Sequence, residues 1–395
     1  MLNDPIVIVS AARTPMGGFQ GDLKSFAAPE LGAAAIRAAV ERSGIRPEQV
    51  DEVVMGCVLP AGQGQAPARQ ASLGAGLPLA AGCTTVNKMC GSGMKAAMFA
   101  HDLLAAGSNE IMIAGGMESM SNAPYLMPKA RAGYRMGHQQ VMDHMFLDGL
   151  EDAYDKGRLM GSFAEDCAGT YAFSREEQDR FAIVSLERAQ KANREGWFAW
   201  EITPIAIRAG KEQRFVENDE QPFKANFEKI PTLKPAFRKD GTVTAANSSS
   251  ISDGAAALVM MRRSHAEKLG LAPLAVVAAH STHAHEPALF STAPVGAIRK
   301  IFDKTGWNAK NVDLYEINEA FAVVTMVAMK ELALPHDKVN VHGGACALGH
   351  PIGASGARIL VTLIGALRKY GGRRGIASLC IGGGEATAMA LEISA

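Results

Sequence analysis

The chain has 395 residues, of which 48% are hydrophobic, and it carries equal numbers of basic and acidic side chains, 40 of each. This length exceeds what one hydrophobic core usually supports, so we expect at least two domains or core layers. The balanced charge provides no overall field to attract nucleic acid or an anionic membrane, so any anionic ligand must be held by local groups.

None of the six cysteines, at positions 57, 83, 90, 167, 346 and 380, forms a CxxC pair or has metal-ligand spacing with a histidine. This pattern argues against a zinc site and a disulfide framework, so we predict no metal and a reducing compartment. The N-terminal residues lack the features of a signal peptide, and no apolar run reaches the ~18 residues of a membrane span. We therefore expect a soluble, cytoplasmic protein.

Short runs of β-branched residues alternate with helical stretches rich in Ala and Leu. In the first third of the chain, the pattern predicts strands at 6–10, 53–55 and 111–113 and helices at 31–40 and 94–106. The alternation returns near the C-terminus, with strands at 312–315 and 376–379 and helices at 319–332 and 359–367. Such alternation is typical of α/β architecture, and its recurrence predicts two α/β halves.

The two halves also echo each other in sequence. Gly91-Ser92-Gly93 and a helix lead to Gly115-Gly116, whereas Gly353-Ala354-Ser355-Gly356 and a helix lead to Gly382-Gly383. A tandem duplication accounts for this echo. Between the halves, at roughly 117–250, the chain is richer in methionine, charge and aromatic residues, and Ser174 with Glu177 forms the capping-box pattern of a helix. We interpret this segment as an insertion that folds over one face.

Cys90 lies in Lys88-Met89-Cys90-Gly91-Ser92-Gly93, where a helical pattern begins. Backbone N–H groups and the positive dipole end at a helix start stabilise a thiolate, which lowers the pKa of the cysteine and makes it a nucleophile. Glycines let a substrate carbonyl approach the backbone closely. On this segment alone, however, a small packed hydrophobic residue is the more common role of a cysteine.

His350 lies in a glycine-rich stretch, 341–356, for which we predict a tightly folded loop. The proline that follows His350 restricts the backbone there, which would hold the imidazole in place. The stretch lacks the G-x-G-x-x-G pattern and follows no clear strand, and these two features argue against NAD binding.

Two further segments place polar groups at the ends of predicted strands. One strand ends in Cys380 and continues into three glycines, 382–384, whose backbone amides can stabilise an oxyanion. Asn318 lies beside two glutamates at the junction of a strand and a helix. On this segment alone, we interpret Asn318 as an ordinary helix cap.

Taken together, these four segments resemble the thiolase superfamily, specifically its acetyl-CoA acetyltransferases, over essentially the whole chain. Further matching stretches are Ser10-Ala11-Ala12-Arg13-Thr14-Pro15, Gly115-Gly116-Met117-Glu118-Ser119-Met120-Ser121, Gly241-Thr242-Val243-Thr244-Ala245-Ala246-Asn247, Asp253-Gly254-Ala255-Ala256-Ala257, Asn318-Glu319-Ala320-Phe321 and Gly349-His350-Pro351. The resemblance implies a five-layered α-β-α-β-α fold built from two duplicated α/β halves. Its expected parts are an N-terminal half (1–120 plus 251–271), an inserted loop domain over the active site (121–250) and a C-terminal half (272–395).

The same resemblance implies a ping-pong acyltransferase that needs no metal and no redox cofactor. Cys90 matches the nucleophile that takes the acyl group, and His350 matches the base that removes its proton. Cys380 matches the second cysteine, which moves a proton to or from acetyl-CoA and therefore needs a pKa near the working pH. The N–H groups of Cys90 and Gly382 match one oxyanion hole, and His350 with a water held by Asn318 matches the other.

The resemblance also implies a coenzyme A site. Ser249 matches a position near the pantetheine amides, and the residues expected to shape an apolar tunnel are Leu150, Met160, Phe237, Ala245, Ala320 and Phe321. Family members are mostly tetramers and some are dimers. We favour a homotetramer, in which the segment 125–145 joins dimers, and expect neither nucleic acid nor a membrane as a partner.

Some positions depart from the family pattern. His342 stands where asparagine is common, Cys346 where an aliphatic residue is common, and Glu385 follows the three glycines where the family has another residue. These departures could alter acyl-chain preference, although we interpret Cys346 as a space-filling side chain. The stretch 156–160 departs from a usual His-Met pair, so the residues that meet the CoA phosphates stay open.

The leading hypothesis is thus a thiolase that interconverts two acetyl-CoA with acetoacetyl-CoA and CoA. A degradative 3-ketoacyl-CoA thiolase of broader chain length is one alternative. A non-catalytic acyl-CoA or lipid-binding protein on the same fold is another, and a redox sensor would rest only on the cysteine count. A decarboxylating ketoacyl synthase is disfavoured, because those enzymes usually have histidine where this chain has Cys380.

Overall fold

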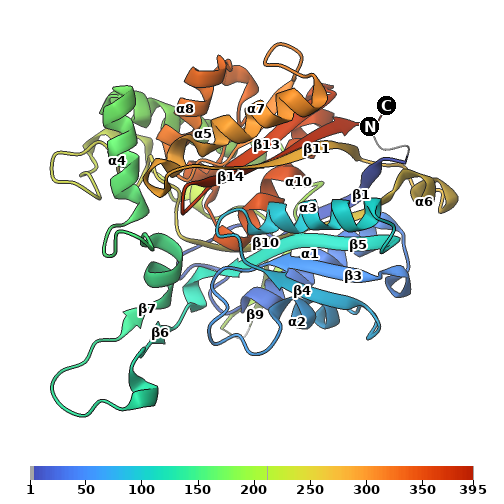
Figure 1. Cartoon of the computed structure of the whole chain (residues 1–395), viewed down its shortest axis with the longest axis horizontal. Coiled ribbons are helices and arrows are strands. Elements are labelled where there is room, and N and C mark those ends of the chain that lie inside the picture. The colour runs from blue at the N-terminus through green and yellow to red at the C-terminus, as the bar shows by residue number, and fades with distance from the viewer. Residues whose placement is uncertain (1–3, 211, 395) are drawn as a thin grey trace.

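One continuous sheet runs through the protein. The computed structural model describes residues 4–210 and 212–394. Ten strands of this described chain form the sheet, nine of them in the order β12-β13-β14-β11-β1-β10-β5-β3-β4, with the short β2 (Gly17–Gly18) paired to β10. Figure 1 shows β3, β4 and β5 of its N-terminal part in blue to teal and its C-terminal part in orange to red, as two layers facing each other.

The N-terminal half contributes five strands of this path: β1 (Ile6–Arg13), β3 (Glu52–Gly56), β4 (Gly82–Val86), β5 (Ile111–Ser119) and β10 (Ser252–Arg262). The strand β3 is parallel to both β4 and β5, whereas β10 is antiparallel to its neighbours β1 and β5. The chain therefore returns from the insertion to place β10 between two strands of the first half. Every residue of β1 and β5 is buried, as expected for strands covered on both faces.

The C-terminal half repeats this arrangement with β11 (Ala275–Ala284), β12 (Leu314–Ile317), β13 (Arg374–Ile381) and β14 (Glu385–Ile393). The strand β12 is parallel to β13, and β14 is antiparallel to β13 and β11. The place of β4 is taken by a single parallel bridge between Tyr315 and Val339. The matching strand order confirms the predicted duplication.

Helices complete the five layers that the family resemblance implies. The outer helices are α1 (Ala28–Ser43) and α2 (Pro67–Gly74) on the N-terminal half, and α7 (Ala293–Thr305) and α8 (Ala322–Leu332) on the C-terminal half. Between the halves lie α3 (Ser92–Ala105) and α10 (Ile352–Tyr370) (Figure 1). Residues 352–367 of α10 are all buried, as befits a helix enclosed by packing on every side. The two sheets are not separate, however, because β1 pairs with β11 at Val7–Val276 and Ile8–Ala275.

The prediction of a loop over 341–356 is wrong for its second part. The short helix α9 (Ala345–Leu348) precedes His350, and α10 begins at Ile352, so Gly353 and Gly356 are helical. These glycines serve close packing rather than a loop, because a Cβ at Gly356 would lie 2.4 Å from the backbone N of Met94 in α3. The absence of side chains there lets the two central helices touch.

The insertion contains more regular structure than a loop domain. It includes α4 (Met160–Tyr171), α5 (Arg175–Arg194), a hairpin of β6 (Tyr125–Leu126) with β7 (Met142–Asp143), and another of β8 (Ile205–Ala209) with β9 (Glu212–Val216). The predicted capping box is confirmed, because Glu177 N donates to Ser174 Oγ and Ser174 N donates to the Glu177 carboxylate. Figure 1 shows the β6–β7 hairpin as an arm that projects from the body.

The short α6 (Arg263–Lys268) connects β10 to β11. It separates the two halves in sequence, so that β11 starts the second copy of the fold. None of the helices described here combines the length and the apolar character that a membrane crossing requires.

Candidate active site

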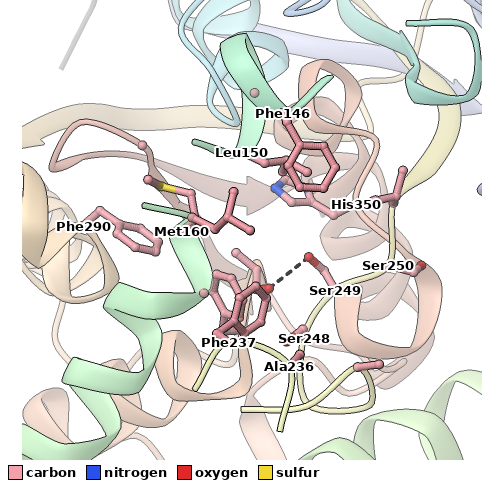
Figure 2. Close-up of a pocket in the computed structure, with 18 residues that line it drawn as sticks. Phe146, Leu150, Met160, Ala236, Phe237, Ser248, Ser249, Ser250, Phe290 and His350 are labelled. Atoms are coloured by element: carbon pink, nitrogen blue, oxygen red, sulfur yellow. Dashed lines mark hydrogen bonds between the residues drawn. The ribbon is translucent and has the colours of Figure 1, made fainter. Parts of the chain in front are cut away.

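A cavity of about 360 Å³ lies between the insertion and the C-terminal half (Figure 2). All seven residues expected to meet coenzyme A line it: Leu150, Met160, Phe237, Ala245, Ser249, Ala320 and Phe321. His350 and Gly382 line the same cavity. Its volume falls in the range of small-molecule sites, and its mostly apolar walls with a few polar groups are typical of them.

Two aromatic side chains of this wall were not found by sequence reasoning. Phe146 comes from the segment before α4, and Phe290 from the turn before α7. Phe290 packs edge-on against Phe321, whose ring also meets Phe237 edge-on. Neither position belongs to a motif, and only the folded chain brings them to the cavity (Figure 2).

A strained turn presents Cys90 between β4 and α3. Met89, just before it, has left-handed backbone geometry with φ of 48°, which is costly for a residue with a side chain. Ser92 holds the turn, because its Oγ accepts from Lys88 N at 2.8 Å and donates to the carbonyl of Met89 at 2.6 Å. The turn is thus built to fix one residue at the start of the helix.

The prediction of a lowered pKa for Cys90 is wrong for this state of the protein. Burial raises the pKa of the Cys90 thiol to about 11, although the backbone N–H groups of Gly382 and of Cys90 itself act in the opposite direction. Removal of water from a thiolate outweighs the help of two N–H groups. The same two N–H groups were predicted to form an oxyanion hole, and both act at the Cys90 sulfur.

His350 is held as a neutral imidazole. Its Nδ1 donates to Ser355 Oγ at 2.6 Å, because that hydroxyl donates its own proton to the carbonyl of Pro351 at 3.0 Å. Nε2 of His350 is buried and has no hydrogen-bond partner within the described residues. Burial lowers the pKa of His350 to about 3, with Arg358 acting in the same direction. The free Nε2 lone pair is therefore available to take a proton.

Cys380 lies at the end of β13, near Cys90. Its side chain is buried, and burial raises its pKa well above the usual value, with the nearby Cys90 adding to the effect. The pKa of Cys380 is thus not near the working pH, as its expected role as proton donor and acceptor would need. The turn that follows, Gly382–Gly384, leads into β14 and places Gly382 against the Cys90 thiol.

An ion pair joins the two segments that carry the cysteines. The ammonium of Lys88, two residues before Cys90, contacts the carboxylate of Glu385, the first residue of β14. A Cβ at Gly91 would also lie 2.4 Å from Cδ1 of Ile381, so the two segments approach closely. Glu385, which departs from the family pattern, therefore helps to set the distance between the two segments.

Asn318 is not a helix cap, contrary to our first interpretation. The helix α8 begins only at Ala322, because the backbone at Phe321 is extended, with φ of −141° and ψ of 151°. Asn318 is 1% exposed, and neither Oδ1 nor Nδ2 of its side chain has a partner among the described residues. Buried polar groups are rarely left so, which indicates that a water or a substrate group completes this amide.

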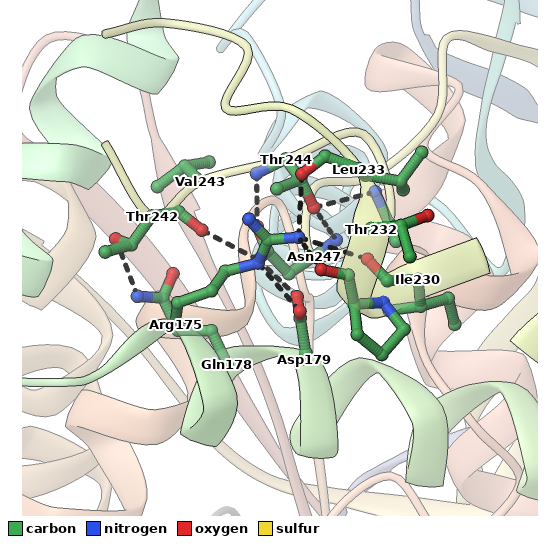
Figure 3. A network of polar contacts seen from close by, with 12 residues as sticks. Arg175, Gln178, Asp179, Ile230, Thr232, Leu233, Thr242, Val243, Thr244 and Asn247 are labelled. Atoms are coloured by element: carbon green, nitrogen blue, oxygen red, sulfur yellow. Dashed lines mark hydrogen bonds and ion pairs between the residues drawn. The ribbon is translucent and has the colours of Figure 1, made fainter. Parts of the chain in front are cut away.

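A network of polar contacts on α5 positions the loop that carries Phe237 and Ser249 (Figure 3). Arg175 pairs with Asp179 at 2.7 Å and donates to carbonyls of the loop, including that of Leu233 at 2.9 Å. Asp179 accepts from Asn247 Nδ2 at 3.0 Å. Because the loop has little regular structure, these bonds replace a helix or strand in fixing it.

The buried Glu118, at the end of β5, is another residue that sequence reasoning did not single out for a role. Its carboxylate accepts from the backbone N–H groups of Val58, Leu59 and Gly353. Burial raises the pKa of Glu118 to about 7. The side chain thereby ties the first turn of α10, just after His350, to the N-terminal half.

The remaining family departures lie outside the reacting groups. His342 is buried among Trp197, Phe198 and Tyr370, and burial lowers its pKa to about 4. Cys346 lines a second cavity of about 320 Å³, which shares Ala245 and Ser250 with the first. Cys346 therefore lines a cavity that has two wall residues in common with the main cavity, and it does not only fill space in the core.

Family models and individual relatives match this chain from end to end. The thiolase N-terminal domain matches residues 6–264, and the thiolase C-terminal domain matches residues 271–393. Acetyl-CoA acetyltransferase 2 of Arabidopsis thaliana is 50% identical, with 98% of this chain and 97% of the relative covered. The acetyl-CoA acetyltransferase of Pseudomonas aeruginosa is 49% identical, with 98% of each covered.

A solved structure is equally similar in its fold. A thiolase from Ascaris suum, crystallised in complex with coenzyme A, superposes with a TM-score of 0.94 at 40% sequence identity. The match covers 99% of this chain and all of that one.

Proposed function

This chain belongs to the thiolase family, and from that premise we propose that it is an acetyl-CoA C-acetyltransferase. The enzyme condenses two acetyl-CoA to acetoacetyl-CoA and CoA, and catalyses thiolysis in the reverse direction. The arrangement of three groups supports this most. The backbone N–H groups of Cys90 and Gly382 point to the Cys90 sulfur, and Gly382 lines the same cavity as His350, whose Nε2 has no hydrogen-bond partner among the described residues.

The first half-reaction transfers the acetyl group to Cys90. His350 Nε2 takes the thiol proton while the sulfur attacks the thioester carbonyl, and the N–H groups of Cys90 and Gly382 donate to the oxyanion. CoA leaves as its thiolate and takes the proton from the imidazolium. Because the pKa values of about 11 and about 3 make a resting ion pair unfavourable, proton transfer must accompany attack.

The second half-reaction makes the carbon–carbon bond. His350 Nε2 takes the thiol proton of Cys380, and the resulting thiolate removes a methyl proton from a second acetyl-CoA, whose enolate oxygen accepts from the Nε2–H of the imidazolium and from a water held by Asn318. The enolate carbon attacks the acetyl group on Cys90, and the C–S bond breaks to give acetoacetyl-CoA and the Cys90 thiolate. The imidazolium of His350 gives its proton to the Cys90 thiolate, which restores the starting state with both cysteines as thiols. The unpartnered amide of Asn318 is what favours this second oxyanion hole.

Coenzyme A would span the two cavities, which share Ala245 and Ser250 in their walls. The apolar walls around Phe237 and Met160 suit the pantetheine arm, and Ser249, whose hydroxyl donates to the Ala320 carbonyl at 2.9 Å, lines the same space. The second cavity contains the side chains of Lys224 and Lys229, which provide positive charge for the phosphates. We propose that the polar end of CoA lies there.

The direct test is CoA-dependent thiolysis of 3-ketoacyl-CoA substrates from four carbons upward, with wild type and Cys90→Ala. We expect strong activity on acetoacetyl-CoA and its loss by at least a thousandfold in the variant. A preference for long chains would replace the proposal with a broader degradative thiolase. Tight acyl-CoA binding with no turnover would replace it with a binding protein.

We also propose a homotetramer built from two dimers. The edge strand β4 pairs only with β3 among the described strands, so its free side can continue the sheet into a second copy. The β6–β7 arm exposes apolar side chains, with Tyr125 67% and Met136 91% exposed. Met136→Asp should convert tetramers to dimers in light scattering, whereas Phe215→Asp, at an exposed site of β9, should not. Unchanged tetramers would exclude the arm as the contact.

We keep a cytoplasmic location as a proposal. A rat relative, 50% identical, is named as mitochondrial, so the family is not restricted to one compartment. Fractionation of cells that express the natural chain would decide, and recovery with mitochondria would overturn the proposal.

A further inference from the structure

Three potential metal ligands converge where the last turn of α3 meets β11. His101 Nδ1 lies 2.9 Å from Asp102 Oδ1, and His280 Nε2 lies 2.9 Å from that oxygen and 3.2 Å from His101 Nδ1. In the described part of the chain, this is the one group of three or more such side chains whose ligand atoms all lie within 4.8 Å of one another. None of the three lines either cavity described above.

The triangle has the dimensions of a metal site. In a tetrahedral zinc site with bonds of about 2.0–2.1 Å, neighbouring ligand atoms lie roughly 3.3 Å apart. The observed separations are 2.9, 2.9 and 3.2 Å, so a point about 2.1 Å from all three atoms exists just above their plane. Two imidazole nitrogens and one carboxylate oxygen are the ligand set of three-coordinate protein sites, with the fourth position left to water.

We propose that His101, Asp102 and His280 bind a divalent transition-metal cation of the zinc class. The cation would join α3, which begins beside Cys90, to β11 of the C-terminal half. In each ring, the nitrogen that faces the cation must carry no proton, so the ring proton would lie on the opposite nitrogen. The proposal is independent of the thiolase activity, because none of the three residues lies in the catalytic cavity.

Neighbouring groups both strengthen and weaken the binding of a cation at this site. Despite the opposing effect of burial, hydrogen bonds from His101 and His280 lower the pKa of Asp102, so it is ionised. Burial lowers the pKa of His280, although Asp102 acts in the opposite direction, and a lowered pKa favours the neutral ring that a ligand needs. The negative end of the α3 dipole also favours a cation. Against these, Lys304 donates to the His280 carbonyl at 2.7 Å and brings a positive charge close.

Cobalt(II) is the sharpest probe, because its visible spectrum reports both geometry and ligand type. We expect one equivalent to bind, with the d–d bands of a tetrahedral nitrogen and oxygen site and no thiolate charge-transfer band. His280→Asn and Asp102→Asn should each weaken binding at least tenfold. His283→Asn, three residues along the same strand, is the matched control and should leave binding unchanged.

Lys304→Met gives an independent test of the same site. Loss of the neighbouring positive charge should tighten cobalt binding several-fold and should enlarge the rise in melting temperature that zinc causes in wild type. All these variants should keep wild-type thiolysis, which shows that they fold. Cobalt binding that survives His280→Asn, a thiolate charge-transfer band for the bound equivalent, or no binding at millimolar metal would each overturn the proposal.

Discussion

The reactivity of His350 depends on one hydroxyl group. Ser355 accepts from Nδ1, which fixes the tautomer that leaves a lone pair on the buried Nε2. In the Ser355→Ala variant, the ring can rotate or exchange tautomers. We expect kcat to fall about tenfold to a hundredfold with KM little changed, as measured by thiolysis of acetoacetyl-CoA.

A buried serine elsewhere controls for the loss of a hydroxyl as such. Ser281 Oγ donates to the Ala297 carbonyl at 2.7 Å, in β11 and away from the cavity lining. Ser281→Ala should lower stability by about 1 kcal/mol but leave kcat unchanged. Equal effects of the two substitutions on kcat would refute a positioning role for Ser355.

The pKa of Cys90 gives a second prediction at this scale. Because burial raises that pKa to about 11, the thiolate fraction should rise about tenfold per pH unit from pH 6 to pH 10. Inactivation of the free enzyme by iodoacetamide should follow the same slope, with the modification located on Cys90 by peptide mapping. A plateau below pH 8 would show a resting thiolate and contradict the neutral pair.

At the scale of elements, the turn before α3 and the β13–β14 hairpin must keep a fixed distance, because each supplies one N–H group to the same sulfur. The Lys88–Glu385 ion pair joins them. Both side chains are partly exposed, so the pair itself should add under about 1 kcal/mol to stability. Its effect should instead appear in catalysis.

Glu385→Gln and Lys88→Gln should therefore each lower kcat several-fold, and the double variant should be no worse than either single one. Steady-state thiolysis of acetoacetyl-CoA measures this cycle. Glu392→Gln in β14, which removes the partly exposed ion pairs of Glu392 with Arg373 and Arg374, should leave kcat unchanged. Additive losses in the double variant would mean that Lys88 and Glu385 act separately.

The contact between α3 and α10 rests on glycine. A Cβ at Gly356 would meet the Met94 backbone, so Gly356→Ala should destabilise the protein by about 1–3 kcal/mol in denaturant unfolding. Gly169 is also helical, in α4, and a Cβ there meets nothing within 4 Å. Gly169→Ala should thus stabilise by about 0.5–1 kcal/mol. If Gly356→Ala were neutral, the two helices would not be packed as described.

At the scale of the molecule, the order of elements was readable from the sequence because each half alternates strands and helices with distinct periodicity. The duplicated glycine motifs also marked the start of the corresponding helix in each half, α3 and α10. What the sequence did not reveal was the join of the sheets at β1 and β11, since strand pairing over 260 residues leaves no local signal.

For the site, too, the sequence revealed some features and not others. The motifs pointed to Cys90, His350 and Cys380, because cysteine and histidine are uncommon residues and these three lie in or beside glycine-rich segments. They did not reveal the raised pKa of Cys90, which depends on burial by distant segments, or that Asn318 precedes an extended turn rather than a helix. Phe290 and Ser355 escaped notice because ordinary residues gain a role only from their neighbours in the fold.

In the proposed mechanism, Cys90 carries the acetyl group between the two half-reactions. The most direct measurement is mass spectrometry of the enzyme quenched in acid after mixing with acetyl-CoA alone, followed by peptide mapping. The account predicts one acetyl group on the peptide that contains Cys90, removed on addition of free CoA and absent from Cys90→Ala. Acetylation elsewhere at the same rate, or turnover with Cys90 unmodified throughout, would contradict it.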